Sequence, residues 1–187
     1  MSRPELSPVS YVVLGLVARD GPSTPYALKA AVARGIAQFW AFPHSQIYAE
    51  TDRLARMRLL AEERESGGRR RRSYRITDAG RAALASWLAE PTGEAPQIRS
   101  LALLKLFFGQ FASEADIAAL ARAQLETQRR RLEVFRGLIE RLETRGDRPW
   151  QLEVAHLLQQ AELTFASSWT RISELVEERP DAAGASG

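Results

Sequence analysis

The chain has 187 residues, of which 45% are hydrophobic and 26% are charged, a composition typical of a folded globular protein. It contains no cysteine, which excludes a disulfide framework, a thiolate zinc site and a cysteine nucleophile. No stretch has the roughly 18–20 uncharged apolar residues of a membrane span, and the first residues lack the pattern of a secretion signal. We therefore expect a cytoplasmic protein with no membrane partner.

The net charge of +3 is unevenly distributed along the chain. Residues 1–90 carry 14 Lys and Arg against 9 Asp and Glu, whereas residues 91–187 carry 12 against 14. The basic excess lies entirely in the first half, which is typical of a half that binds nucleic acid or another anionic surface. A mildly basic globular domain without such a partner is the alternative interpretation.

Two helices are predicted near the N-terminus. Ser7 and Thr24 each precede a proline, and a capping hydroxyl followed by proline is typical of a helix start. Residues 9–18 are nearly all apolar, so the first helix is expected to be largely buried. The second helix is short and is predicted to stop near Gly35.

An aromatic segment, residues 39–43, leads to a third helix that is predicted from about residue 44 or 45 to residue 58. Its helical periodicity places apolar and polar residues on different faces. The first face comprises Ile47, Thr51, Leu54 and Arg58, and the opposite face comprises Gln46, Ala49, Arg53 and Arg56. A helix that presents glutamine and arginine outward suits a polar partner.

A β-hairpin is predicted next. Two short extended segments, residues 59–64 and 73–76, are separated by a pair of glycines, which is typical of a hairpin turn. Four consecutive arginines follow these glycines: Arg69, Arg70, Arg71 and Arg72. Thr77 and Asp78 then cap a fourth helix, predicted over residues 79–89.

The second half is predicted to be helical. After a linker at residues 91–96 we expect a short apolar helix over 98–108, a long helix from 113 to about 144 and a last helix over 150–178. The long helices carry apolar stripes that a two-helix hairpin cannot bury alone, so we expect a homodimer. The residues expected at its interface are Leu132, Phe135, Phe165 and Ile172. The alternative is that both stripes pack on the first domain of the same chain.

The order of helix, helix, polar-faced helix, basic hairpin and capped helix is typical of a winged helix-turn-helix domain. The major groove of B-form DNA admits one helix, and Ser45, Gln46 and Arg53 have the chemistry to contact base edges there. Tyr48 and Lys29 are expected to contact phosphates. The hairpin arginines suit backbone phosphates or a narrow A·T-rich minor groove. Taken singly, an arginine run is more often a solvated surface and Gln46 an ordinary surface residue; their order along the chain favours DNA.

Residues 6–90 resemble the PadR family of bacterial transcriptional regulators. The resemblance rests on residues 13–17, 26–29, 39–48, 54–60 and 72–80. It implies a winged-helix fold and the function of a regulator, usually a repressor. The second half resembles the larger PadR subgroup, whose helical C-terminal domain mediates dimerisation. Departures are Pro25, where the family usually has glycine, and Met57-Arg58, where acidic residues or glycine are common.

An enzyme is not expected. The two histidines, His44 and His156, are far apart and lack partners at metal-ligand spacing, and no phosphate-binding glycine loop or nucleophile elbow occurs. We expect no metal and no cofactor. A small aromatic effector is compatible with the four tryptophans, and Trp150 and Trp169 are the candidates to stack on it, as in some PadR relatives; ordinary core tryptophans are the alternative.

The combined prediction is a mainly α protein. It has a winged helix-turn-helix DNA-binding domain at residues 1–90 with a short β-hairpin wing, a helical dimerisation domain at residues 97–179 and a disordered tail at residues 180–187. We predict a transcriptional regulator, in most cases a repressor, that binds an inverted-repeat operator in double-stranded DNA as a homodimer and is released by an effector. The alternative is a basic nucleic-acid-binding protein or a helical protein-interaction adaptor without ligand sensing.

Overall fold

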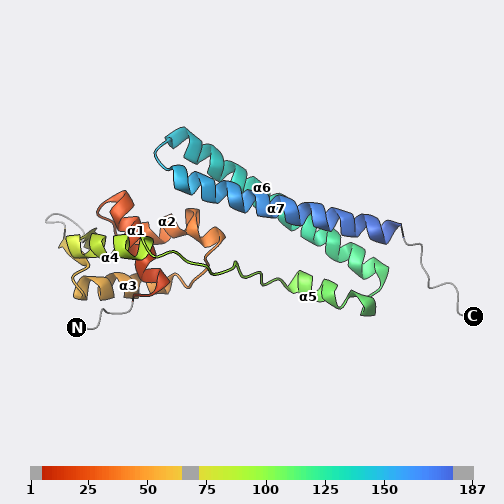
Figure 1. Cartoon of the computed structure of the whole chain (residues 1–187), viewed down its shortest axis with the longest axis horizontal. Coiled ribbons are helices and arrows are strands. Elements are labelled where there is room, and N and C mark those ends of the chain that lie inside the picture. Colours follow the sequence, from red (N-terminus) through yellow and green to blue (C-terminus); the bar gives the residue numbers. More distant parts are fainter. Residues whose placement is uncertain (1–5, 65–71, 179–187) are drawn as a thin grey trace, which may run out of the picture. The chain divides into compact units, whose positions relative to one another are not determined.

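The structure, a computed structural model, describes residues 6–64 and 72–178 of the chain (Figure 1). The chain divides into two compact units, Met1–Ala95 and Pro96–Gly187. The expected class, mainly α with one β-hairpin, is confirmed. In the described part of the chain, no helix is both long and apolar enough to cross a bilayer.

The first unit contains the predicted elements in the predicted order. They are α1 (Pro8–Asp20), α2 (Pro25–Arg34), the 3-10 helix η1 (Ile36–Gln38), α3 (Ser45–Arg56), β1 (Leu60–Arg64), β2 (Arg72–Ile76) and α4 (Asp78–Leu88). The helix starts follow from capping side chains: the hydroxyls of Ser7, Thr24 and Thr77 each accept a backbone N–H from the first turn. The sequence missed η1 and extended α3 by two residues.

The hairpin is antiparallel, with its register running from Leu60 opposite Ile76 to Arg64 opposite Arg72. On its other side, β2 forms a short bridge to Ser23, in which the two backbone N–H···O bonds of Ser23 and Tyr74 measure 3.0 and 2.9 Å. The base of the wing is therefore fixed from both sides. The predicted turn, including Arg69, Arg70 and Arg71, lies outside the described residues.

Helix α1 lies at the centre of the first unit and contacts α2, α3, α4 and β2. This central position explains why no residue of its predicted apolar run, residues 9–18, is exposed: five are buried and the other five are half-buried. The core consists of Val13, Leu14, Leu16, Val17, Leu28, Val32, Ile47, Leu54, Leu60, Tyr74 and Ile76. Removing this much apolar surface from water is the main force that holds α3 and the hairpin on one rigid body.

The second unit contains α5 (Leu101–Phe107), the 3-10 helix η2 (Gly109–Phe111), α6 (Glu114–Arg145) and α7 (Pro149–Glu177). The predicted capping box at the start of α6 is present, because Ser113 and Asp116 exchange hydrogen bonds with each other's backbone N–H. Gly146, in the left-handed conformation with φ 67°, ends α6. The expected helical start at residue 98 is wrong: α5 begins at Leu101, capped by Ser100.

Helices α6 and α7 form a long helical hairpin (Figure 1). The buried positions of this pair recur every seven residues, at Ala121, Gln128 and Phe135 on α6 and at Ala155, Glu162 and Trp169 on α7. This seam is displaced from the apolar stripe that helical periodicity predicts for α7, which runs through Val154, Leu157, Ala161, Phe165, Ile172 and Val176. Two members of that stripe, Val154 and Leu157, are 43% and 69% exposed. The sequence favoured the more apolar face, whereas α6 packs against the face with the small Ala155.

Candidate nucleic-acid interface

Helix α3 presents a polar surface above a fully buried apolar one. Ile47, Thr51 and Leu54 have no exposed surface, and the buried Thr51 hydroxyl donates to the carbonyl oxygens of Ile47 and Tyr48. On the other side Ser45, Gln46, Tyr48 and Ala49 are all exposed. Of the two predicted faces, the burial of Ile47, Thr51 and Leu54 and the exposure of Gln46, Ala49 and Arg56 are confirmed, whereas Arg58 lies beyond the end of α3 and is exposed. This polar face is accessible to a partner that has a groove wide enough for a helix.

The N-terminus of α3 suits an anionic partner. Its first turn contains no acidic residue, and its cap residue, His44, makes no side-chain capping hydrogen bond. The partial positive charge of the helix end is therefore not offset by a carboxylate of that turn. Backbone N–H groups at such a helix end bind phosphate oxygens readily.

Arg53 does not have the outward orientation expected from the sequence. Its guanidinium is hydrogen-bonded to the Glu50 carboxylate at 3.0 Å and to the Ser10 hydroxyl of α1 at 3.1 Å, and Ser10 in turn donates to Glu50 at 2.5 Å. The Glu50 side chain is only 12% exposed, so it needs this cation. The hydrogen bond to Glu50 raises the pKa of Arg53. Arg53 thus connects α3 to α1, a role that helix periodicity alone does not reveal.

Two arginines of β2, Arg72 and Arg75, face glutamates of β1 across the hairpin. Arg72 lies 3.5 Å from Glu62, and Arg75 lies 2.8 Å from Glu63. Arg72 remains 58% exposed, so its charge is partly available to a partner. Glu62 and Glu63 of β1 therefore partly offset the charges of Arg72 and Arg75.

Tyr74 connects the hairpin to α3. Its side chain is 1% exposed, and its hydroxyl donates to Asp52 Oδ1 at 2.6 Å. Burial, together with the hydrogen bond and charge of Asp52, raises the pKa of Tyr74 to about 12. Sequence reasoning missed this pair, because its two residues lie on a strand and on a helix, 22 positions apart, and no local pattern connects them.

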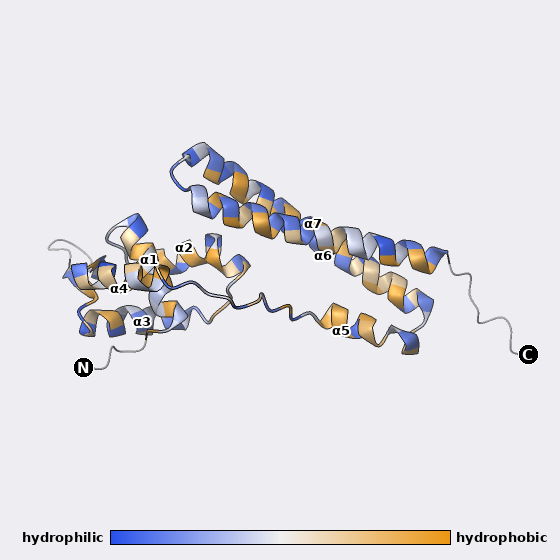
Figure 2. Cartoon of the chain, viewed as in Figure 1, coloured by the Kyte–Doolittle hydropathy of each residue, from blue (hydrophilic) through white to orange (hydrophobic). Residues whose placement is uncertain are grey.

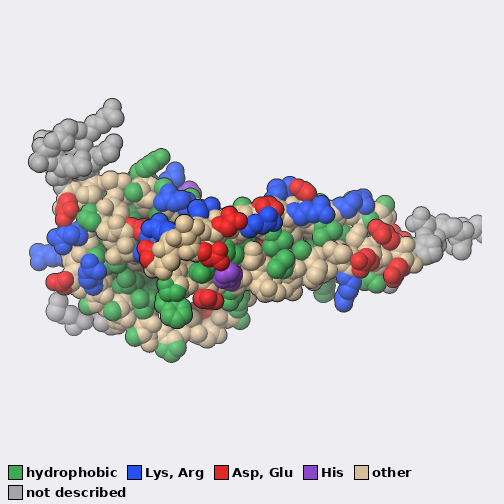
Figure 3. Space-filling model, turned by 90° about the horizontal axis from the view of Figure 1, so that it is seen from above, with side chains coloured by type: hydrophobic (Ala, Val, Ile, Leu, Met, Phe, Trp, Pro, Cys, Tyr) green, Lys and Arg blue, Asp and Glu red, His purple; other side chains and the backbone are tan. Residues whose placement is uncertain are grey.

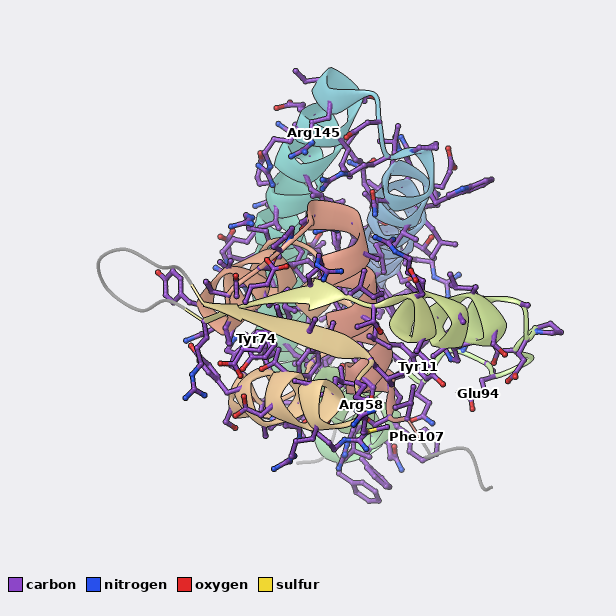
Figure 4. The ribbon with its side chains drawn as sticks, turned by 90° about the vertical axis from the view of Figure 1, so that its left-hand side faces the viewer. Tyr11, Arg58, Tyr74, Glu94, Phe107 and Arg145 are labelled. Atoms are coloured by element: carbon purple, nitrogen blue, oxygen red, sulfur yellow. The ribbon has the colours of Figure 1, made fainter. Side chains whose placement is uncertain are left out.

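The remaining predicted DNA contacts lie on the first unit. Tyr48 is 45% exposed on α3, and Lys29 is half-buried on α2. Figure 4 shows that α3 and the hairpin run side by side, with Arg58 where α3 ends and the hairpin begins. An open hollow of about 600 Å³ near this end is lined by Asp52, Ala55, Arg56, Arg58, Leu60, Ala61, Glu62 and Thr77. The exposed Arg56 and Arg58 were not predicted as contacts.

The second unit has a different chemistry. Acidic and basic side chains intermingle on one of its faces (Figure 3), and several pair along α6, such as Arg130 with Glu126 and Arg136 with Glu133. Helix α5 is predominantly apolar (Figure 2). The large apolar side chains exposed on and around it are Ile98, Leu101, Leu104, Phe107, Phe108 and Phe111. Sequence reasoning did not single out this surface.

The predicted dimer residues lie mostly inside the α6–α7 pair. Phe135 has no exposed surface, whereas Leu132, Phe165 and Ile172 are half-buried. The two candidate effector tryptophans differ sharply: Trp150 is 80% exposed at the start of α7, and Trp169 is 2% exposed in a core with Ala102 and Ala121. Among the residues placed by the structure, no cluster of acidic, histidine or cysteine side chains is suited to hold a metal ion.

Comparisons with known proteins agree with this architecture. Residues 13–86 match the transcriptional regulator PadR-like family, and residues 98–169 match the virulence activator alpha C-terminal family. The negative transcriptional regulator PadR of Bacillus subtilis is 26% identical over 136 residues, which cover 72% of this chain and 74% of the relative.

Two crystal structures of Bacillus subtilis PadR are similar in fold. The structure in complex with operator DNA has a TM-score of 0.80 and 23% identity, covering 90% of this chain and 98% of the other. The structure in complex with p-coumaric acid has a TM-score of 0.77 and 23% identity, covering 94% of this chain and 100% of the other. Both share the winged helix and the C-terminal helices.

Proposed function

Because residues 13–86 match the transcriptional regulator PadR-like family, we propose that this chain binds duplex DNA as a homodimer and represses transcription at an inverted-repeat operator. The observation that carries the proposal is the exposed polar face of α3, held above the fully buried Ile47, Thr51 and Leu54 beside an arginine-bearing hairpin. The Bacillus subtilis relative, which is similar in fold, was crystallised with operator DNA, and this supports the same partner here.

Base reading is assigned to the first turns of α3. Gln46 is exposed and can form two hydrogen bonds to adenine, and Ser45 can bond to either base type. Tyr48, Lys29 and the hairpin arginines are assigned to phosphates, which position a protein on DNA without reading its sequence. Arg53, which pairs with Glu50 and Ser10, holds α3 in place rather than reading bases.

The homodimer is assigned to the second unit. The α5 surface exposes several large apolar side chains, among them Phe107 at 77% and Phe111 at 84%, which is unusual for a surface that stays in water. A second copy of the chain would bury them. A two-fold dimer then places two copies of α3 in successive major grooves, with half-sites roughly 34 Å or about 10 base pairs apart.

Regulation by a small aromatic acid is the finer part of the proposal. The Bacillus subtilis relative was crystallised with p-coumaric acid, a flat phenolic carboxylate. Of the two tryptophans considered, Trp150 is accessible to such a molecule, whereas Trp169 is enclosed by its own chain. Titration of p-coumaric acid into the protein should quench tryptophan fluorescence and release bound DNA. A Trp150→Leu variant that responds equally would remove Trp150 from the site.

The decisive experiment selects binding duplexes from a random DNA pool with the full-length protein and sequences them. We expect an enriched inverted repeat whose affinity falls steeply with salt. If the dimer contacts roughly 6–10 phosphates, log K falls against log salt with a slope of about −5 to −9. A helical adaptor would enrich no sequence, and a non-specific basic protein would bind all duplexes with equal affinity. Either result would overturn the proposed function.

A further inference from the structure

Tyr74 is restrained at its backbone, its ring and its hydroxyl. Its backbone is paired with Glu62 of β1 on one side and with Ser23 on the other. Its ring is part of the core, and its hydroxyl donates to Asp52 of α3 at 2.6 Å. A buried hydroxyl is unfavourable without a partner, and phenylalanine would fill nearly the same volume. The hydroxyl therefore serves its polar partners, the Asp52 carboxylate and Arg72 of its own strand, and the bond to Asp52 is the one that joins it to α3.

Asp52 also needs an explanation. It lies one helical turn after Tyr48 and is exposed beside the polar face of α3. A carboxylate on a helix that approaches DNA repels phosphates, so this position disfavours the proposed function unless the carboxylate does something else. Here it accepts a charge-assisted hydrogen bond, which is stronger and more directional than a neutral one.

We propose that the Asp52–Tyr74 hydrogen bond is a positioning link that fixes the wing hairpin relative to α3, so that both elements contact one DNA duplex at the same time. The inference rests on the proposed DNA-binding function and assigns a role to two residues in it. Tyr74 lies at the hairpin's fixed base, and Arg72, two residues closer to the turn, points to the same side of the strand. A rotation of the hairpin about this base would move Arg72, which lies farther along the strand toward the turn than Tyr74 does.

Loss of the link should leave both elements and their shared core formed, while the angle between them varies over a wider range. The hairpin ladder is made by backbone groups and the core by apolar side chains, including the Tyr74 ring, so neither depends on the Tyr74 hydroxyl. The wing would then contact phosphates only part of the time, while α3 would still enter the groove. The expected signature is a smaller salt dependence with retained sequence preference.

The test measures fluorescence anisotropy of two duplexes at several salt concentrations: one selected by the wild-type protein and one of mixed sequence. The variants are Tyr74→Phe, which removes the donor, Asp52→Ala, which removes the acceptor, and Asp52→Asn, which keeps an acceptor oxygen. Both Asp52 variants remove the same charge, so their difference isolates the hydrogen bond. The control is Tyr11→Phe, because the Tyr11 ring stacks on Trp87 at 4.4 Å in the same unit, away from this link.

For Tyr74→Phe we expect affinity for both duplexes to fall about fivefold to tenfold and the salt slope to become shallower by about 1–2, the change for one or two lost phosphates. Asp52→Ala should show the same shallower slope relative to Asp52→Asn, and the double variant Tyr74→Phe/Asp52→Ala should add nothing to Asp52→Ala. Asp52→Asn and Tyr11→Phe should keep the wild-type slope.

Unchanged slopes in Tyr74→Phe, or equal slopes in the two Asp52 variants, would overturn the link while leaving DNA binding intact. Failure of the wild-type protein to bind either duplex would instead overturn the proposed function. If Tyr74→Phe does not fold, the comparison of Asp52→Ala with Asp52→Asn decides alone.

An independent measurement is possible because the chain contains no native cysteine. Spin labels attached at Ala49→Cys and Arg75→Cys report the distance between α3 and the hairpin. We expect the distance distribution to broaden in Asp52→Ala and to stay narrow in Asp52→Asn; equal widths would contradict the inference.

Discussion

At the scale of single residues, the turn from α3 into the hairpin is closed by close backbone contacts. Arg58 has φ 59°, the left-handed region that favours glycine. The Thr77 hydroxyl lies 2.8 Å from the Arg58 carbonyl oxygen and 3.0 Å from that of Leu59. Gly80 packs directly beneath, and a β-carbon there would come within 2.2 Å of the Leu59 oxygen. This turn sets where the hairpin leaves α3.

We therefore predict that Gly80→Ala destabilises the first unit by about 2–3 kcal/mol, at the upper end of overpacking effects, because backbone has to move. The measurement is urea unfolding monitored by circular dichroism. The matched control is Gly15→Ala in α1, where nothing lies within 4 Å of the added β-carbon. That change should stabilise by about 0.5–1 kcal/mol, the helix preference of alanine over glycine. Similar effects at both positions would contradict the close approach.

Tyr74 gives a prediction about alkaline stability. Its pKa in the folded protein is raised to about 12 by burial and by Asp52, above the ordinary value of 10.0. A folded-state pKa above the unfolded one means that the stabilisation is complete below about pH 10 and is lost as pH rises toward 12. One of the four tyrosines should thus ionise late in an absorbance titration. Tyr74→Phe should remove that late step and flatten the alkaline loss of stability, with Tyr11→Phe as the control that keeps it.

At the scale of elements, most helix ends were predictable because they depend on local chemistry. Ser7, Thr24 and Ser113 identify helix starts from the residues beside them, and the structure places their caps as expected. The side-chain links between elements were not predictable in this way. Arg53 binds Ser10, 43 residues earlier, and only the packed arrangement of α1 on α3 brings them together. Helical periodicity predicts the face of the helix on which a side chain lies. It does not predict which residue of another element that side chain contacts.

The α6–α7 seam shows the same limit. Periodicity favoured its apolar positions, yet the described seam includes the polar Gln128 and Glu162. Glu162 is paired with Arg131 at 2.5 Å, and Arg131 also lies over the Phe135 ring. Gln128 Oε1 is buried without a hydrogen-bond partner among the described residues. One polar residue of the seam is therefore compensated and the other is not.

This difference predicts opposite effects of removing the two polar groups. Glu162→Ala should destabilise the second unit by about 1–3 kcal/mol, because Arg131 loses its partner, although the partial exposure of Arg131 moderates the loss. Gln128→Met should be neutral or stabilise by about 1 kcal/mol, because a buried unpaired acceptor is replaced by an apolar side chain of similar size. Thermal unfolding of the two variants makes the comparison. Destabilisation by Gln128→Met would show that the amide finds a partner in the assembled protein.

At the scale of the whole molecule, the charge asymmetry of the sequence coincides with the division of the chain into two units. The basic residues 1–90 fall in the unit with α3 and the hairpin, and the apolar surface of α5 falls in the other. A single winged helix contacts few base pairs, so selective occupancy among competing genomic sites requires two linked copies. Sequence-specific affinity is thus expected to depend on a surface that does not touch DNA.

The last prediction tests that dependence. Phe107→Glu places a charge on the α5 surface at a side chain that is 77% exposed, so the fold of the single chain should tolerate it while the proposed dimer should not. Light scattering at micromolar concentration should show a dimer for the wild-type protein and a monomer for the variant. Leu88→Glu, at a side chain that is 68% exposed in the first unit, is the control and should remain dimeric. The monomer should keep weak, salt-dependent binding to any duplex but lose most of its preference for the selected inverted repeat, because binding at one half-site no longer holds the second recognition helix near its own half-site. A Phe107→Glu variant that stays dimeric, or a wild-type protein that is monomeric, would place the determinants of specificity elsewhere.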